Sequence, residues 1–308
     1  ERGRPRARNM SIDELHGKVR WRERASHDVP CAGMGDCLAA DPQSGAIVSI
    51  GGASVSEATL WSTSGVRVVL CCAQTVRSVA IEGDTVATGL QSGGIALFEG
   101  SSGRQRATLE GHAQVVIGLA MRDGHVYSGG GDKSVKQWLA ASGACVATMA
   151  EHTDTIFSVA AGDQVVLSAS RDTTVKLWPA GGGPSRHTMK HPERAYGVSV
   201  QGDAVATACG DGVVRVWSLV TGECAHALRG HTQAVVSVSL QGRLLASGAY
   251  DWKVPGSARV WWLGDDAAWT CIAALDHTTY VRAALLRPNG ELWTHANQLK
   301  VWGWSAEE

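Results

Sequence analysis

The 308-residue sequence lacks long apolar runs, an excess of either charge and paired cysteines, and each absence narrows the kind of protein it can encode. No run approaches the roughly 18 apolar residues of a membrane-spanning helix, and the first ten residues, ERGRPRARNM, contain no apolar signal region. We therefore expect a protein that does not enter a membrane. Lysine and arginine total 28 against 29 acidic residues, and this balance disfavours nucleic acid as a partner because it leaves no broad basic surface.

The eight cysteines form no Cys-x-x-Cys pair, and most of them lie inside apolar runs typical of strands. This pattern is typical of reduced thiols in the core of an intracellular protein. We expect free core thiols and a location in the cytoplasm, the nucleus or both.

Two short motifs suggest a bound group, but neither has the context that such a group requires. His187 and His191 are four residues apart in HTMKH, a spacing that can bind zinc on a helix, whereas this run is typical of an outer strand and a turn. The glycines at 181–183 precede Pro184, with neither a Gly-Lys-Ser/Thr sequence nor a helix after them. The sequence therefore predicts neither a metal site nor a cofactor.

A short polar pattern recurs four times along the chain. In SGGGDKSVKQW, Ser128 is followed by Asp132 and Trp138, and His112 lies 16 residues upstream of Ser128. The four sets are His112, Ser128, Asp132 and Trp138; His152, Ser168, Asp172 and Trp178; His191, Thr207, Asp211 and Trp217; and His231, Ser247, Asp251 and Trp261, the last with four inserted residues before its tryptophan. The histidines are separated by 40, 39 and 40 residues, which is typical of a stacked or radial repeat.

Each unit has the composition of four short strands. In the third unit, the runs VVIGLAM (115–121), HVYSGG (125–130), SVKQWL (134–139) and CVATM (145–149) are β-branched or apolar and are separated by turn sequences. Helical periodicity of convincing length occurs nowhere in the chain. The sequence therefore predicts an all-β fold.

These units resemble WD40 repeats, and the resemblance extends over nearly the whole chain. The resemblance rests on a Gly-His or related pair near the start of a unit and on a tryptophan near its end. The pairs are Gly111-His112, Glu151-His152, Lys190-His191, Gly230-His231 and Asp276-His277, and the tryptophans are Trp138, Trp178, Trp217, Trp261 and Trp302. The aspartate that should follow the tryptophan is absent from all five units. The resemblance implies a β-propeller.

Two less regular units bring the count to seven, a number that closes a ring in β-propellers. One of them has Thr88, Ser92 and Phe98 behind Cys72 in the histidine position. The other has Ser49 and Trp61 behind His27, with an insertion between them. We therefore expect a seven-bladed propeller.

The seventh unit contains only three strand-like runs, whereas KVRWRERASH at 18–27 is typical of an outer strand leading into a turn. We expect residues 18–24 to pair with residues 299–303 and close the ring without a free sheet edge. The domain would then cover residues 14–308, after a basic flexible tail over residues 1–13. Arginines at positions 2, 4, 6 and 8 of this tail are typical of a solvated linker, with a nucleic-acid contact or a localisation signal as alternatives.

We expect the four polar sets to have a structural role rather than a catalytic one. In the WD40 family the indole, hydroxyl, imidazole and carboxylate form one buried hydrogen-bonded chain, which crosses an apolar blade without an unpaired polar group. A hydrolase triad needs an exposed hydroxyl beside an oxyanion hole. An enzyme also needs only one such site, whereas this chain has four copies of the set. We therefore expect no enzyme. The first, second and seventh units carry incomplete sets, with Asn297 or Gln298 near the aspartate position of the seventh.

The same resemblance implies a partner-binding surface on the narrow face of the propeller, at fixed offsets from the repeat histidine and the turn aspartate. Aromatic and arginine side chains gather at these positions, and both types dominate interface energetics. The candidates are Arg77, Phe157, Arg171, Arg194, Tyr196, Tyr250, Tyr280 and Arg282. Their chemistry suits an acidic or phosphorylated peptide. The alternative is that these are scattered surface aromatics without a ligand.

The function that follows by analogy of fold is a non-enzymatic scaffold or adaptor, a monomeric propeller within a larger complex. Two alternatives stay open: the substrate-recognition module of a cullin-type ubiquitin ligase, and a propeller of RNA processing or ribosome assembly. The sequence does not identify the protein partner.

Overall fold

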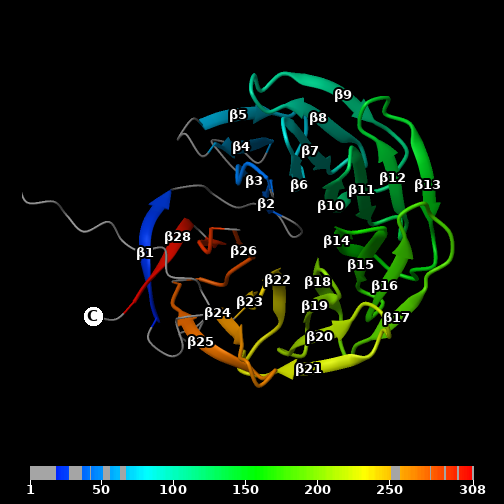
Figure 1. Cartoon of the computed structure of the whole chain (residues 1–308). Coiled ribbons are helices and arrows are strands. Elements are labelled where there is room, and N and C mark those ends of the chain that lie inside the picture. The colour runs from blue at the N-terminus through cyan, green and yellow to red at the C-terminus, as the bar shows by residue number, and fades with distance from the viewer. Residues whose placement is uncertain are drawn as a thin grey trace, which may run out of the picture.

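The computed structural model describes residues 19–27, 37–41, 43–50, 56–62, 67–250, 257–277, 279–287, 289–296 and 298–306 (Figure 1). These residues form 28 strands in seven four-stranded sheets arranged around one axis. Within the described ranges there is no helix that could span a membrane. The expected tail over 1–13 lies outside these ranges, so the division at residue 14 stays a prediction.

The blades are numbered from the first complete sheet. Blade 1 contains β2 (Leu38–Ala40), β3 (Ile47–Ile50), β4 (Glu57–Trp61) and β5 (Arg67–Cys71). Blade 2 contains β6 (Val76–Glu82), β7 (Thr85–Leu90), β8 (Ile95–Glu99) and β9 (Gln105–Leu109). Blade 3 contains β10 (Val116–Arg122), β11 (His125–Gly130), β12 (Val135–Leu139) and β13 (Cys145–Met149). Blade 4 contains β14 (Ile156–Gly162), β15 (Val165–Ser170), β16 (Thr174–Pro179) and β17 (His187–Lys190).

The remaining blades complete the ring. Blade 5 contains β18 (Ala195–Gln201), β19 (Ala204–Cys209), β20 (Val214–Ser218) and β21 (Cys224–Leu228). Blade 6 contains β22 (Val235–Gln241), β23 (Leu244–Ala249), β24 (Ala258–Leu263) and β25 (Trp269–Leu275). Blade 7 contains β26 (Ala283–Leu286), β27 (Leu292–His295), β28 (Leu299–Ala306) and, as its outer strand, β1 (Val19–His27).

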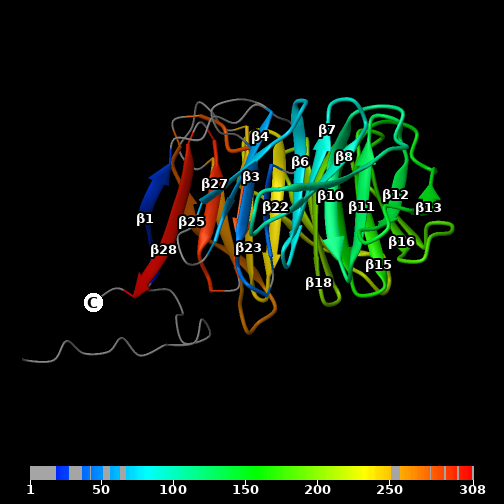
Figure 2. The ribbon, with the colours of Figure 1, turned by 90° about the horizontal axis from the view of Figure 1, so that it is seen from above.

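Each blade is an antiparallel meander that runs outward from the axis, so β10, β14, β18 and β22 lie near the centre and β13, β17 and β21 at the rim (Figure 1). Two-residue turns join the first two strands of blades 2 to 6. Between β10 and β11, Asp123 and Gly124 both have positive φ, at 52° and 72°, which matches the twist of a two-residue hairpin. The innermost strands all begin on one face, termed the upper face, which is uppermost in Figure 2 where β10 points down.

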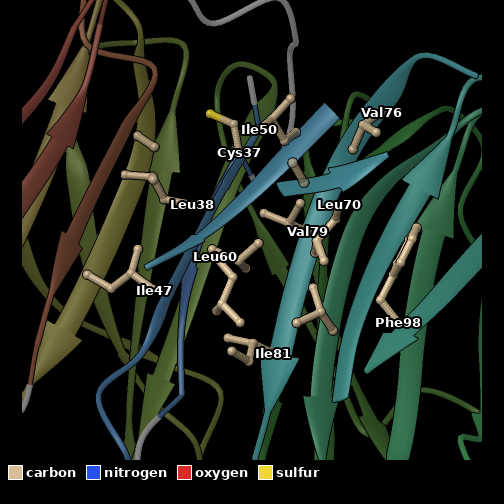
Figure 3. Close-up of a cluster of buried hydrophobic side chains, with 14 of the residues drawn as sticks. Cys37, Leu38, Ile47, Ile50, Leu60, Leu70, Val76, Val79, Ile81 and Phe98 are labelled. Carbon is tan, nitrogen blue, oxygen red and sulfur yellow. The ribbon is translucent and has the colours of Figure 1, made fainter. Parts of the chain in front are cut away.

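The apolar core lies between neighbouring blades rather than in one central mass. Leu60 of blade 1 lies beside Val79 and Ile81 of β6 in the gap between blades 1 and 2, whereas Leu38 and Ile47 point to the opposite side of blade 1 (Figure 3). Full burial of a side chain of this size stabilises the fold by about 1.5–3 kcal/mol. The tryptophans of the repeats act likewise, since Trp178 of blade 4 packs with residues of blade 3. Each blade is therefore stabilised by its neighbours, which requires a closed ring.

The ring closes through β1, as the sequence predicted, and the pairing is longer than expected. β1 runs antiparallel to β28, from Val19 opposite Ala306 to His27 opposite Leu299, with a register shift between Glu23 and Ala25. The expected pairing ended at residue 303, but β28 continues to Ala306 and so offers more partners to β1.

Removing β1 is expected to destabilise the propeller, because it exposes the edge of β28 and part of the core beside Ala25. A variant without residues 1–27 should melt at a lower temperature and associate with increasing concentration in size-exclusion chromatography. A variant without residues 1–18 keeps β1 and is the matched control. Equal melting and equal elution of the two variants would contradict this account of closure.

Candidate functional site

The polar sets in blades 3 and 4 form complete buried chains. In blade 3, the Trp138 indole N–H donates to Ser128 Oγ at 2.8 Å, and His112 Nε2 lies 2.7 Å from the same hydroxyl. His112 Nδ1 lies 2.8 Å from Asp132 Oδ2. Because the Asp132 carboxylate can only accept a hydrogen bond, Nδ1 carries the ring proton and donates it, and Nε2 of the neutral ring accepts from the Ser128 hydroxyl.

Blade 4 repeats this geometry with almost the same distances. Trp178 donates to Ser168 Oγ at 2.8 Å, and His152 bridges Ser168 and Asp172 at 2.7 Å on each side. Burial alone would raise the pKa of Asp172, but the hydrogen bonds from His152 and Thr174 outweigh it and hold that pKa well below its ordinary value. The carboxylate is therefore ionised and acts as the fixed end of the chain.

Blade 5 departs from the predicted arrangement at its aspartate. His191 Nε2 lies 2.8 Å from Thr207 Oγ1, and Trp217 donates to the same hydroxyl at 2.9 Å. His191 Nδ1, however, donates to the Met189 carbonyl at 3.2 Å, while Asp211 forms a two-pronged ion pair with Arg215, at 2.6 and 3.2 Å. The expectation that Asp211 ends the chain is wrong for this blade.

The cause lies two residues after the aspartate. At this position blades 3 and 4 have Ser134 and Thr174, whose hydroxyls donate to the turn aspartate at 2.9 and 2.6 Å and hold it beside the histidine. Blade 5 has Val213, which cannot do so, and the guanidinium of Arg215 takes its place as donor. Burial, assisted by the charge of Arg215, lowers the pKa of His191 from 6.5 to about 4.

In blade 6, His231 Nε2 lies 2.7 Å from Ser247 Oγ and Trp261 donates to that hydroxyl at 2.9 Å. Asp251, the predicted fourth member, lies outside the described residues. The four hydroxyls of Ser128, Ser168, Thr207 and Ser247 all have 0% exposure. Because a substrate could not reach them, these chains have the geometry of structural supports rather than of a catalytic triad.

The irregular units keep part of the pattern. Trp61 donates to Ser49 at 3.2 Å, and Cys72 contacts Thr88 at 3.4 Å. In blade 7, Trp302 donates to Thr294 at 2.7 Å, a bond that the sequence reading missed because Thr294 precedes its tryptophan by eight residues rather than ten. The Asn297 position lies outside the described residues.

His277 is the histidine of blade 7. Its ring lies edge-on to Trp302, with 5.4 Å between the centroids, and its Nε2 is buried without a hydrogen-bond partner among the described residues. Burial, assisted by the charge of Lys300, lowers its pKa to about 4.

The predicted partner-binding residues divide into two groups. Phe157, Tyr196, Tyr250, Tyr280 and Arg282, termed the mouth cluster, lie at the upper ends of blades 4 to 7. The rings of Phe157 and Tyr196 stack at 5.1 Å, and those of Tyr250 and Tyr280 meet edge-on at 4.9 Å. All but Tyr280 line a cavity of about 230 Å³ along the axis.

Phe157 is more enclosed than expected, with 7% of its surface exposed, because its ring supports that of Tyr196. The other three candidates do not line the cavity. Arg171 is exposed with its Nε 3.8 Å from Asp154, Arg194 is exposed on blade 5, and Arg77 Nε donates to Gln91 at 2.7 Å.

Seven of the eight cysteines lie in the described residues, and the prediction that they belong to the core is wrong for four of them. Cys37, Cys72 and Cys209 are buried, whereas Cys71, Cys145, Cys224 and Cys271 are exposed free thiols on outer strands. An apolar run does not reveal which strand of a blade is outermost, and this is why the sequence placed these thiols in the core.

No group of three or more metal-binding side chains occurs within the described ranges. His187 and His191 serve separate contacts. His187 Nε2 lies 3.1 Å from the Val220 carbonyl, and His191 Nε2 binds Thr207.

Comparison with known proteins agrees with this geometry. The family model described as WD domain, G-beta repeat matches residues 143–179 and 222–254. The chain is 34% identical over 105 residues to nuclear distribution protein PAC1-2 of Uncinocarpus reesii, and 42% identical over 50 residues to WD repeat-containing protein pop1 of Schizosaccharomyces pombe. These matches cover 31% and 16% of this chain, but only 23% and 6% of the two relatives.

Solved structures share the fold over most of the chain. The WD40 β-propeller domain of Doa1 has a TM-score of 0.77 at 20% identity and covers 92% of this chain and 97% of its own. A chain of the mitotic checkpoint complex has a TM-score of 0.80 at 18% identity, covering 98% and 96%, and U3-55K has 0.76 at 21%, covering 94% and 98%. At these identities the likeness extends to the fold alone.

Proposed function

The chain carries WD40 repeats and folds as a seven-bladed β-propeller, and on this premise we propose that it is a non-enzymatic scaffold that binds a segment of a partner protein at the mouth cluster. Propellers of this family are generally protein-interaction modules. We further propose that the bound segment is acidic or phosphorylated, and that the protein works in the cytoplasm or the nucleus.

The observation that carries the proposal is the gathering of aromatic side chains around one cavity. The sequence contains only four tyrosines, and three of them, Tyr196, Tyr250 and Tyr280, belong to the mouth cluster. Their rings are packed in pairs and are therefore held in place before a ligand arrives, which lowers the entropy cost of binding. Tyrosine and arginine at the centre of a surface are the residue types that contribute most to protein interfaces.

The buried hydroxyls support a scaffold over an enzyme. Ser128 and Ser168 have the hydrogen bonds of a triad, but each hydroxyl is covered by a tryptophan indole. Binding of a partner at the protein surface is therefore better supported than catalysis by Ser128 or Ser168.

The test compares proteins captured by the parent chain with those captured by the variant Tyr196→Ala/Tyr250→Ala. We expect the double variant to lose at least about tenfold of the specific partner in affinity purification with mass spectrometry, since two interface anchors are removed. Val146→Ala is the control, because Val146 is 49% exposed at the rim on β13. Undiminished capture by the double variant would refute the site.

The same experiment separates the two narrower functions. Ubiquitin-ligase subunits that depend on the mouth cluster would assign the scaffold to substrate recognition, and ribonucleoproteins would assign it to RNA processing. No contact within the described residues favours either of them over a general scaffold.

A further inference from the structure

The cavity beneath the mouth cluster has a distinctive charge. Its lining combines apolar side chains, serine hydroxyls and the tyrosines of the mouth. Among the described residues that line it, Arg282 is the single ionisable base, and none is an aspartate or a glutamate. A cavity of about 230 Å³ is smaller than a typical small-molecule site of roughly 300–1,000 Å³. Its size suits one side chain of a bound peptide.

Arg282 is held in position by its neighbours. Its guanidinium lies over the Tyr280 ring, with 5.0 Å from Cζ to the ring centroid, and donates to the Tyr280 hydroxyl. Its backbone N–H donates to the His295 carbonyl at 2.8 Å. A guanidinium oriented in this way loses little further freedom when it forms a two-pronged contact with a carboxylate.

Two serines of blade 6 add donors to the cavity wall. Ser237 Oγ accepts the N–H of Ala284 at 2.7 Å, and Ser239 Oγ accepts the N–H of Leu286 at 3.0 Å. Both serines line the cavity, and because each Oγ is the acceptor in these two bonds, its own O–H can be donated to a bound group. A group that only accepts hydrogen bonds, as a carboxylate does, matches these donors.

We propose that this cavity binds one aspartate or glutamate side chain of the partner segment, with its carboxylate on Arg282. The inference rests on the proposed function and makes it more specific. One guanidinium balances one carboxylate, whereas a phosphate of charge about −1.5 to −2 would bring an unbalanced charge into a cavity with no second base among the described residues that line it.

The exposed arginines of the upper face have a different role. The side chains of Arg171 and Asp154 are 47% and 41% exposed at 3.8 Å, so their charges are largely compensated by each other and by solvent. Such rim charges affect the rate of encounter more than the choice of ligand. The choice between an acidic and a neutral side chain is therefore made by Arg282.

The experiment is a selection from a random peptide library on the parent protein, followed by affinity measurements on single peptides. We expect selected peptides to share a glutamate or aspartate at one position, and its replacement by glutamine to weaken binding at least about tenfold. With Arg282→Met, the glutamate and glutamine peptides should bind equally. Arg282→Lys should keep part of the preference, and Arg171→Gln should keep all of it, as the matched control. Thermal melting checks that each variant is folded.

The outcomes distinguish this inference from the proposed function. Peptides that need Tyr196 and Tyr250 but show no acidic preference, or keep that preference with Arg282→Met, would overturn the carboxylate site and leave the scaffold standing. A phosphoserine peptide that outcompetes the glutamate peptide and depends on Arg282 would also overturn it. If no peptide binds the parent better than Tyr196→Ala/Tyr250→Ala, both proposals fail.

Discussion

Replacing Asp172 by alanine is expected to lower the free energy of unfolding by about 3 kcal/mol, and the same change at Asp211 is expected to cost less, because it leaves the hydrogen bonds of His191 intact. Asp172 accepts hydrogen bonds from His152 Nδ1 and the Thr174 hydroxyl, at 2.7 and 2.6 Å, and from the backbone N–H groups of Thr153 and Thr174, at 3.0 and 2.9 Å. Its removal leaves the buried imidazole N–H with only the Thr174 hydroxyl, 3.3 Å away, in reach as an acceptor, and takes the carboxylate from two backbone N–H groups. Each group left unpaired costs about 1–3 kcal/mol.

Asp211 provides the matched control because it occupies the same position in its repeat without the same partners. It binds Arg215 and the N–H of Val213, at 2.6 and 3.1 Å, and His191 does not depend on it. Denaturant unfolding of both variants measures the difference. Equal losses would mean that the carboxylate of blade 4 does not support its histidine as the geometry indicates.

Acidification from pH 6.5 to 4 is expected to remove about 3 kcal/mol of stability for each of His191 and His277. Burial lowers both pKa values from 6.5 to about 4, so in this window the unfolded chain binds protons that the folded chain does not. The stabilising contribution of each neutral imidazole is therefore complete above pH 6.5 and is lost as the pH falls towards 4.

The buried aspartates respond in a separate, lower window. The pKa of Asp132 and that of Asp172 lie below the ordinary 3.8, because hydrogen bonds to the carboxylates outweigh the effect of burial. Their contribution is present above pH 3.8 and is lost only below it.

Denaturant unfolding between pH 4 and 7 tests the histidine contribution. His277→Gln should flatten the dependence of stability on pH by about 1.4 kcal/mol per pH unit in the window from 4 to 6.5. An unchanged slope would show that protonation of His277 is not linked to unfolding.

The repeat period predicted the blades, and the strand-like run at 18–27 beside a seventh unit of three strands predicted the ring closure. The hydroxyl–indole contacts were implied by the resemblance to WD40 repeats. The partner of Asp211 could not be predicted in this way, because it depends on whether His191 or Arg215 lies within hydrogen-bond distance of the carboxylate. A signal was nevertheless present, because the hydroxyl of Ser134 and Thr174 is replaced by Val213. Thr294 was missed for the opposite reason, as a shortened turn changed its spacing.

The candidate site was predictable in position but not in detail. The repeat offsets place Phe157 and Arg282 on one face, and both line the cavity. They do not reveal that Phe157 lies beneath Tyr196, or that Arg171 is beside Asp154 while Arg282 faces the cavity, because these facts depend on packing between blades.

The direction of the closing strands determines how the propeller responds to mechanical force. His27 pairs with Leu299, so the two flanks of the propeller leave the β1–β28 ladder at the same end, opposite the pair Val19–Ala306. Tension that separates these flanks acts along the hydrogen bonds, which are perpendicular to the strands, and loads the residue pairs one after another. The ring therefore peels open in the manner of a zipper, beginning at the pair His27–Leu299, and blade 7 is the first part of the molecule to yield under pulling.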